Sequence, residues 1–227
     1  MKKDLLELKR LLEELKTIKM TRVKKEEVYG TSIKEFNGVK YIPLTDLSKG
    51  QFVTTERYIC SLNNGEDIVR EKIQKAKKDG SAVIIIPVTQ NNEVIVTVEP
   101  RVFTKQTVGV GFPAGYIEAG EEPEVSALRE LQEEIGVIPK KLIPLASFYQ
   151  DEGISGAKNT AYLALDCTEG HEKNPDEGEF VKYFKCEFQD VLTLQEEGYI
   201  EGANSIIAIE KAKPYFNKKG KIKQKYK

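Results

Sequence analysis

The sequence predicts an α+β protein, because two segments typical of strands precede a longer segment typical of a helix. Residues 81–88 (SAVIIIPV) form a continuous apolar run rich in β-branched side chains, as in a buried strand. Residues 93–98 (EVIVTV) alternate in polarity after the turn residues 90–92, so the two segments are predicted to pair as a hairpin. Residues 121–137 have apolar side chains at helical spacing, with Pro123 near the start and Gly136 after the end.

Further strands and helices are predicted after this segment, and together they define the main domain, residues 79–215. The strands are expected at 145–149 and 160–165, and the helices at 190–197 and 203–215. Residues 211–227 contain eight lysines and few apolar side chains. The Lys-rich tail at 216–227 is therefore predicted to be solvated and frayed.

The N-terminal region, residues 1–78, is predicted to be a small helix-plus-antiparallel-β extension. Apolar residues at helical spacing between Leu5 and Ile18 indicate an amphipathic helix, which packs either on its own domain or on a second copy. Residues 28–60 contain short strand-like runs around turn signals, whereas residues 66–79 are predicted to be helical. Limited apolar surface and exposed strand edges lead us to expect that this region forms a homodimer.

Composition and charge exclude several classes of protein. The chain of 227 residues is 40% apolar, which is enough to bury a core. Its 35 basic and 36 acidic residues give a net charge of -1. His171 is the only histidine, and Cys60, Cys167 and Cys186 are far apart, which disfavours a disulfide scaffold or a zinc site and suits the cytoplasm. No apolar run reaches the length of a membrane span. Neither a membrane nor a nucleic acid is an expected partner.

The predicted helix at 121–137 carries three acids that its amphipathic pattern places away from the core. Glu130, Glu133 and Glu134 fall opposite a predicted apolar stripe of Val125, Leu128, Leu131 and Ile135. Glu130 and Glu134 lie one turn apart, where like charges destabilise a helix, and neither has a cation three or four positions away. Two interpretations are open, a solvated acidic face or a group of cation ligands.

The loop before the helix favours the second interpretation. Gly115 and Gly120 flank a turn, and Glu121 is placed to return and pair with Arg129. A loop folded back on the helix would bring backbone carbonyls close to the carboxylates. Such oxygen ligands suit a hard divalent cation, Mg²⁺ or Mn²⁺, and not zinc.

This segment resembles the Nudix box, G-x5-E-x7-R-E-U-x-E-E-x-G-U with U aliphatic, at every defined position. The matching residues are Gly115, Glu121, Arg129, Glu130, Leu131, Glu133, Glu134, Gly136 and Val137. The resemblance implies the Nudix fold, a mixed β-sheet sandwiched between helices. It also implies metal-dependent hydrolysis of a nucleoside diphosphate linked to another moiety.

The resemblance also implies roles for individual residues. By motif position Glu130 and Glu134 would bind metal, with Glu133 as a further ligand or as the base, and the carbonyl of Ala114 is a further expected ligand. The structural residues of the motif would be Gly115, Glu121, Arg129 and Gly136, with Glu121 and Arg129 as a pair.

Three segments outside the box are similar to ADP-ribose and ADP-sugar pyrophosphatases: VEPR at 98–101, FPAG at 112–115, and GYI at 198–200 followed by the helical segment 203–209. The similarity implies cleavage of ADP-ribose or an ADP-sugar to AMP and a sugar phosphate. On that analogy Arg101 would contact phosphate, the alternative being a surface arginine at the rim. Phe103 or Tyr116 is a candidate for stacking on the base, the alternative being plain packing.

One departure from this subfamily affects the expected base. Those enzymes usually read Y-P-S-P-G-x-S-D-E after the box, whereas this chain reads YQDEGISGA at 149–157. Glu152 replaces the second proline, and the S-D-E acids are missing. Glu133 and Glu152 are therefore the two candidates for the residue that activates water.

Other classes of function are weighed against hydrolysis. Residues 109–114 (GVGFPA) partly match a dinucleotide-binding fingerprint, but Pro113 opposes the helix that this motif needs. A Nudix module that binds ADP-ribose-like ligands without hydrolysis typically lacks box glutamates, and all are present here. A Nudix hydrolase of another nucleotide class, such as dinucleoside polyphosphates, NADH or cap structures, is the remaining alternative.

Overall fold

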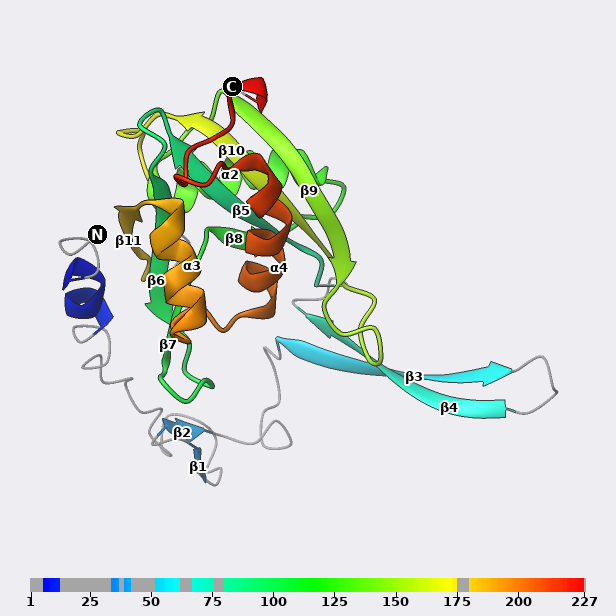
Figure 1. The fold of residues 1–227 in the computed structure, drawn as a ribbon. Helices are drawn as coiled ribbons and strands as arrows, with labels where there is room; N and C mark the ends of the chain where they lie inside the picture. The colour runs from blue at the N-terminus through cyan, green and yellow to red at the C-terminus, as the bar shows by residue number, and fades with distance from the viewer. Residues whose placement is uncertain are drawn as a thin grey trace. The chain divides into compact units, whose positions relative to one another are not determined.

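The computed structural model describes residues 6–12, 34–36, 39–41, 52–61, 67–75, 80–174 and 180–226 (Figure 1). The chain divides into two units, the first made of residues 1–18, 82–148 and 159–227, and the second of residues 19–81 and 149–158. In the described parts of the chain, no helix is long and apolar enough to cross a membrane.

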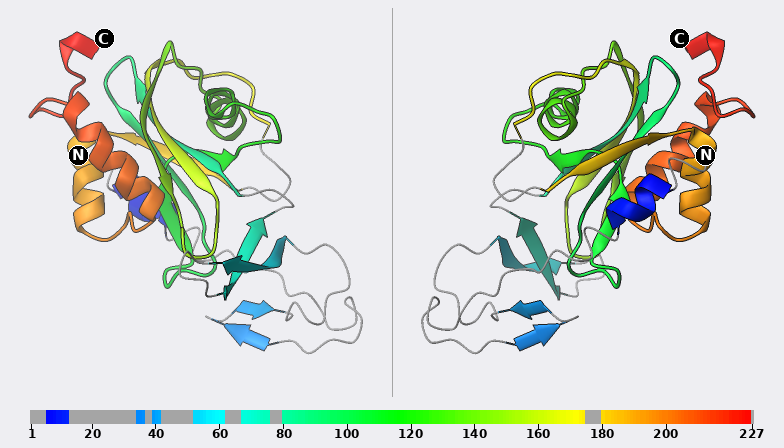
Figure 2. Two further views of the ribbon diagram at one scale, coloured as in Figure 1. Left: turned by 90° about the vertical axis from the view of Figure 1, so that its right-hand side faces the viewer. Right: turned by 90° about the vertical axis from the view of Figure 1, so that its left-hand side faces the viewer.

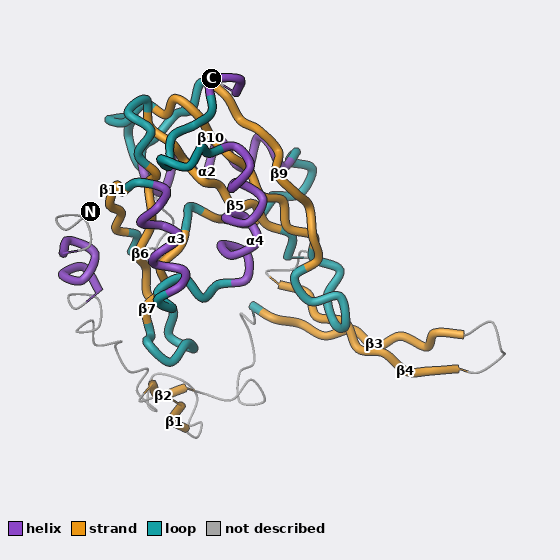
Figure 3. The backbone as a smooth tube through the Cα atoms, in the orientation of Figure 1, coloured by secondary structure: helices purple, strands orange, loops and turns teal. Residues whose placement is uncertain are grey.

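The first unit is built on a mixed sheet. Its seven strands are β5 (Ala82–Thr89), β6 (Val94–Pro100), β7 (Val108–Gly111), β8 (Ala114–Tyr116), β9 (Lys141–Tyr149), β10 (Lys158–Cys167) and β11 (Lys182–Cys186). The order is β11-β6-β5-β10-β9, with β7 paired to β6 and β8 paired to β5 (Figure 3). Strand β5 runs antiparallel to β6 and parallel to β10. The predicted hairpin of β5 and β6 is confirmed, with Val88 opposite Val94.

Helices cover both faces of this sheet. They are α2 (Pro123–Ile135), α3 (Phe188–Glu196) and α4 (Ala203–Ala212). Alternate residues of β5 point to opposite faces: Val83 and Ile85 pack with α2, whereas Ile84 and Ile86 belong to the core that includes α3 and α4. Figure 2 shows α2 on one side of the sheet and α3 with α4 on the other. The predicted α+β class and the sheet between helices are confirmed.

The N-terminal helix packs on its own unit where it is described. Residues 6–12 are helical, and Leu8, Leu11 and Leu12 are buried in the core that includes α3 and α4. Of the two interpretations of the leucine stripe, packing on its own domain is thus observed for these three residues. The remaining residues of the predicted helix, Leu5 and 13–18, lie outside the described residues.

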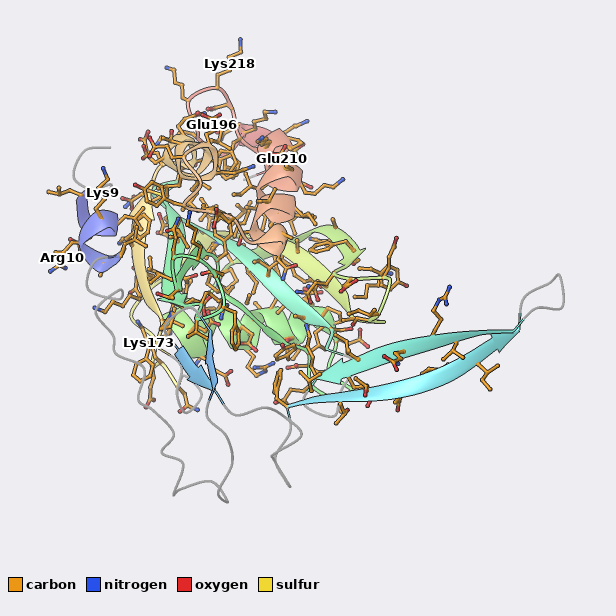
Figure 4. The ribbon with its side chains drawn as sticks, turned by 90° about the horizontal axis from the view of Figure 1, so that it is seen from below. Lys9, Arg10, Lys173, Glu196, Glu210 and Lys218 are labelled. Carbon is orange, nitrogen blue, oxygen red and sulfur yellow. The ribbon has the colours of Figure 1, made fainter. Side chains whose placement is uncertain are left out.

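Residues 216–226 of the Lys-rich end are ordered, so the prediction that they are frayed is wrong. The ring of Phe216 stacks on Phe188 of α3, with centroids 3.7 Å apart and planes 2° apart. Phe216 also forms an antiparallel bridge with Ile222, whose N–H donates to the Asn92 side chain at 3.1 Å. Phe216 and Ile222 are buried, whereas Lys218, Lys219 and Lys225 are exposed; Lys218 is labelled in Figure 4.

The second unit contains two antiparallel pairs, β1 (Lys34–Phe36) with β2 (Val39–Tyr41) and β3 (Val53–Ser61) with β4 (Asp67–Lys75). The short strands expected within 28–60 are therefore present. The helix predicted for 66–79 is wrong, because β4 is paired along its whole length with β3. Pairing with the preceding strand outweighs a weak local helical pattern.

Candidate functional site

Helix α2 is the element that positions the predicted site, and its ends are well defined. Pro123 stands at the first turn, where a missing N–H costs nothing. Gly136 ends the helix in the left-handed conformation at φ 66°, and its N–H bonds to the carbonyl of Gln132. The loop after β10 adds two bonds to this end, from the N–H of His171 to Gly136 and from the N–H of Asn174 to the carbonyl of Glu133.

The inward face of α2 differs from the predicted stripe. Leu131 and Ile135 are buried as expected, but Val125 and Leu128 are 56% and 41% exposed. Glu130 and Glu134, which were expected on the opposite side, are buried at 7% exposure each. The helix packs against both β5 and β8, and contact with β8 turns the flank that carries the two glutamates inward. Buried carboxylates need charged or polar partners, so this face is a built polar site.

Arg129 is the centre of a network that ties the glycine loop to the helix. Its Nε and Nη2 donate to the two carboxylate oxygens of Glu121, both at 3.0 Å. Its Nη1 donates to Glu130 at 2.7 Å and to Glu133 at 3.0 Å, and its Nη2 also reaches the Tyr116 carbonyl at 3.1 Å. The expected pair of Glu121 and Arg129 is present. Glu130 does have a cation partner, because Arg129, the preceding residue, pairs with it. The prediction from sequence considered only cations three or four positions away and so missed this pair.

Within the network, Glu121 and Arg129 keep each other charged. Hydrogen bonds from Arg129 lower the pKa of the Glu121 carboxyl to about 2. In return, the bonds to Glu121 raise the pKa of the Arg129 guanidinium, against the opposing effect of burial. Arg129 thus pairs with the carboxylates of Glu121, Glu130 and Glu133.

Gly115 brings the Glu130 carboxylate against the backbone of β8. A Cβ atom at Gly115 would lie 1.9 Å from Oε1 and 2.4 Å from Oε2 of Glu130. The glycine is needed for this close approach, because any side chain would occupy the position of the carboxylate. Since Ala114 precedes Gly115 in β8, the structure brings together the backbone and one acid of the predicted metal site.

Arg101 lies at the rim of the sheet, and its charge acts on the Tyr116 phenol. It is 53% exposed, and its Nη2 pairs with Glu99. Burial raises the pKa of the Tyr116 phenol, and the nearby charge of Arg101 opposes that rise. The carbonyl of the same Tyr116 accepts a bond from Arg129. Of the two aromatic candidates, Phe103 is 75% exposed and Tyr116 is 37% exposed, so both rings have surface for a ligand.

Comparison with known proteins decides the family. The sequence model of the NUDIX domain matches residues 78–208, more than half of the chain. The chain belongs to the Nudix family. As the box predicted, it is a Nudix hydrolase, and its resemblance to the ADP-ribose pyrophosphatase subfamily is confirmed.

Individual relatives of this Nudix protein agree. It is similar to the ADP-ribose pyrophosphatase of Bacillus subtilis, with 35% identity over 150 residues that cover 66% of this chain and 78% of the relative. It is also similar to the methanol dehydrogenase activator of Bacillus methanolicus, with 28% identity over 172 residues that cover 75% and 90% of the two chains. The fold matches a solved ADP compounds hydrolase with a TM-score of 0.64 and 22% identity, over 74% of this chain and 89% of that one.

Nudix hydrolases generally use divalent metal ions, and the donors of this site fit such an ion. The carboxylates of Glu130, Glu133 and Glu134 and the carbonyl of Ala114 are hard oxygen donors. Within the described ranges, no three acidic, histidine or cysteine side chains form a complete metal cage by themselves. Mg²⁺ is commonly held by one or two carboxylates together with waters and substrate phosphates, so an incomplete protein cage suits an ion shared with a substrate.

Glu152 lies in the second unit, within the loop 149–158, and its side chain is exposed. The loop is folded on itself, because the N–H of Ser155 bonds to the carbonyl of Asp151 at 2.8 Å. It is also tied to β4, where the N–H of Ile73 donates to the carbonyl of Ile154 at 2.8 Å. A catalytic role for Glu152 stays a prediction.

Proposed function

We propose that this Nudix protein hydrolyses the pyrophosphate bond of ADP-ribose or an ADP-sugar, with AMP and a sugar phosphate as products. The observation that carries the proposal is the buried carboxylate of Glu130, seated on Gly115 and bonded to Arg129. Such a polar site inside a folded domain costs stability, so a catalytic use is its best explanation. The ADP-ribose pyrophosphatase of Bacillus subtilis, at 35% identity, supports the choice of substrate.

Mg²⁺ or Mn²⁺ is the proposed cofactor. Glu130, Glu133, Glu134 and the Ala114 carbonyl would hold it, since all four offer the oxygen ligands that these ions prefer. A bound divalent ion neutralises charge on phosphoryl oxygens and acidifies water. The protein contributes the fixed position of these donors, and the Arg129 network restrains the loop and helix that carry them.

Arg101 is the proposed phosphate-binding residue, and Glu133 or Glu152 is the proposed base. A guanidinium presents several N–H donors to a phosphate, and that of Arg101 is half exposed. Glu133 is 32% exposed, so water can reach its carboxylate. We expect Glu152→Gln to slow turnover with metal affinity unchanged, because a base acts in the transition state. Wild-type turnover in Glu152→Gln would leave Glu133, or the bound metals alone, to activate the water.

A panel of nucleotides tests the activity. ADP-ribose, ADP-sugars, NADH, dinucleoside polyphosphates and CDP-alcohols are incubated with the full chain and Mg²⁺ or Mn²⁺, and the products are identified. We expect AMP and ribose 5-phosphate from ADP-ribose, and no reaction in chelator. Rapid cleavage of another nucleotide with ADP-ribose left intact would move the protein to another Nudix class. Tight binding of ADP-ribose without any cleavage would make it a binding module.

A homodimer that uses the N-terminal region is also proposed. In the β3–β4 hairpin Ile59 is directly opposite Val69, and these apolar side chains are 74% and 56% exposed. An exposed apolar pair on a two-stranded ribbon favours association with a second copy. Light scattering is expected to show a dimer for the wild type and a monomer for Ile59→Lys with Val69→Lys. A wild-type monomer at working concentration would refute the dimer.

The cytoplasm is the proposed location. Cys167 is a buried free thiol in the structure, as suits a reducing compartment. Fractionation of the source cells with an antibody against the chain would test it, and recovery outside the cytoplasm would refute it.

A further inference from the structure

The backbone of Arg101 is fixed on both sides by its own loop. Its N–H donates to the carbonyl of Thr107 at 2.8 Å. Its carbonyl accepts the N–H of Thr104 at 2.9 Å and the hydroxyl of Thr104 at 2.8 Å. Residues 101–107 therefore form a closed turn between β6 and β7, and Arg101 stands at its base.

The side chain of Arg101 lies on the backbone of Gly109 in the neighbouring strand. A Cβ atom at Gly109 would be 2.5 Å from Cγ, 3.5 Å from Cβ and 3.7 Å from Cδ of Arg101. Gly109 pairs with Glu99 in regular antiparallel register and is not one of the glycines with positive φ. Other residue types can therefore adopt the backbone conformation of Gly109. A glycine is needed because the side chain of Arg101 occupies the space that a Cβ atom would take.

The stability of the fold does not explain this arrangement. The ion pair of Arg101 and Glu99 is exposed, with side chains 53% and 23% accessible, and such pairs contribute little to folding. The pair does orient the guanidinium. A guanidinium has five N–H donors, so the bond from Nη2 to one oxygen of Glu99 leaves capacity for a second anion.

We propose that Gly109 is a positioning residue, which seats the stem of Arg101 so that its guanidinium meets the diphosphate of the nucleotide. The inference rests on the proposed function, because it takes the nucleotide diphosphate as the anion. Gly109 itself contacts no substrate and acts only through Arg101. The expected consequence is control of substrate affinity, with the chemistry at the acids of α2 left intact.

Gly109→Ala is the test, with the full chain, Mg²⁺ and whichever nucleotide the wild type cleaves. The new methyl group displaces Cγ of Arg101, so KM should rise about tenfold, the order lost with a hydrogen bond to a charged group. We expect kcat to stay within about twofold. The ¹⁵Nε signal of Arg101, assigned with Arg101→Lys, should move because the guanidinium leaves its seat. Gly202→Ala is the matched control, since its new Cβ would be 3.9 Å from Ser205, an ordinary contact, and KM should not change.

A double-mutant cycle separates seating of Arg101 from distortion of β7. If Gly109 acts through Arg101, adding Gly109→Ala to Arg101→Ala should cause no further rise in KM. An equal rise in both backgrounds would overturn the inference. A wild-type KM in Gly109→Ala would also overturn the inference. The proposed function would still stand in that case, provided that the wild type hydrolyses a nucleotide. Failure of the wild type to cleave any nucleotide would refute the proposed function, and with it the anion assumed here.

Discussion

Replacing Gly115 by alanine should disable the enzyme while leaving it folded. The added Cβ would lie 1.9 Å from Oε1 of Glu130, whereas ordinary van der Waals contact begins near 3.4 Å. The carboxylate of Glu130 must therefore retreat by about 1.5 Å. A misplacement of about 1 Å at a catalytic group can cost about 100-fold in rate, so we expect kcat to fall by at least about 100-fold.

The fold should tolerate the same change. The displaced atoms are the end of a flexible side chain, so the main loss is the bond of Glu130 to Arg129, roughly 2 kcal/mol. At this chain length that corresponds to a melting temperature lower by roughly 4–8 °C. Steady-state kinetics and thermal melts measure the two effects, with Gly202→Ala as the control. Wild-type kcat in Gly115→Ala would refute the placement of Glu130 in the catalytic site.

A second variant tests whether steric displacement is the cause. Glu130→Asp shortens the side chain by one methylene, which makes room for the new methyl group. In the background of Gly115→Ala, we expect Glu130→Asp to recover part of the lost kcat. A double variant slower than both single variants would show that the methyl group acts by another route.

Three further predictions follow from the structure. Glu134→Gln should lower kcat by at least about 100-fold with little change in melting temperature. Its control is Glu124→Gln at an exposed position of the same helix, which should keep wild-type activity. Full activity of Glu134→Gln in chelator would exclude a metal role for Glu134. Because the pKa of Glu121 is lowered from 4.5 to about 2, its contribution to stability is complete above pH 4.5 and lost as the pH falls toward 2. The loss is about 3 kcal/mol by chemical denaturation, and Glu121→Gln should remove this part of the acid dependence. Phe216→Ala should destabilise the protein by about 3 kcal/mol, since it removes the ring stacked on Phe188, and an unchanged melting temperature would contradict the ordered C-terminal end.

The box and the ends of its helix could be predicted from local sequence. Pro123 and Gly136 mark the start and the end of α2, and both act within one turn of the backbone. The pairing of Glu121 with Arg129 follows from a glycine loop that returns to the helix. The hairpin of β5 and β6 was equally readable, because alternation and turn residues are features of adjacent positions.

The inward face of α2 was decided by tertiary structure. Apolar spacing alone placed Val125 and Leu128 in the core, yet both are exposed and Glu130 and Glu134 are buried. The packing partner β8 sets the rotation of the helix, and a hydrophobicity pattern contains no information on polar contacts with a neighbouring strand.

Pairing and packing between separate segments also decided the rest of what the sequence missed. Residues 67–75 form a strand because β3 pairs with them, and the Lys-rich end is ordered because Phe216 meets Phe188. The stem of Arg101 lies against the backbone of Gly109. In the sequence, the only sign of this contact is a glycine within a short strand. The sequence by itself determined the motif, the class of fold and the family, since these depend on residue types and short spacings. The tertiary structure alone decided which of those residues are buried, paired or in contact, because burial and close approach depend on how separate segments pack.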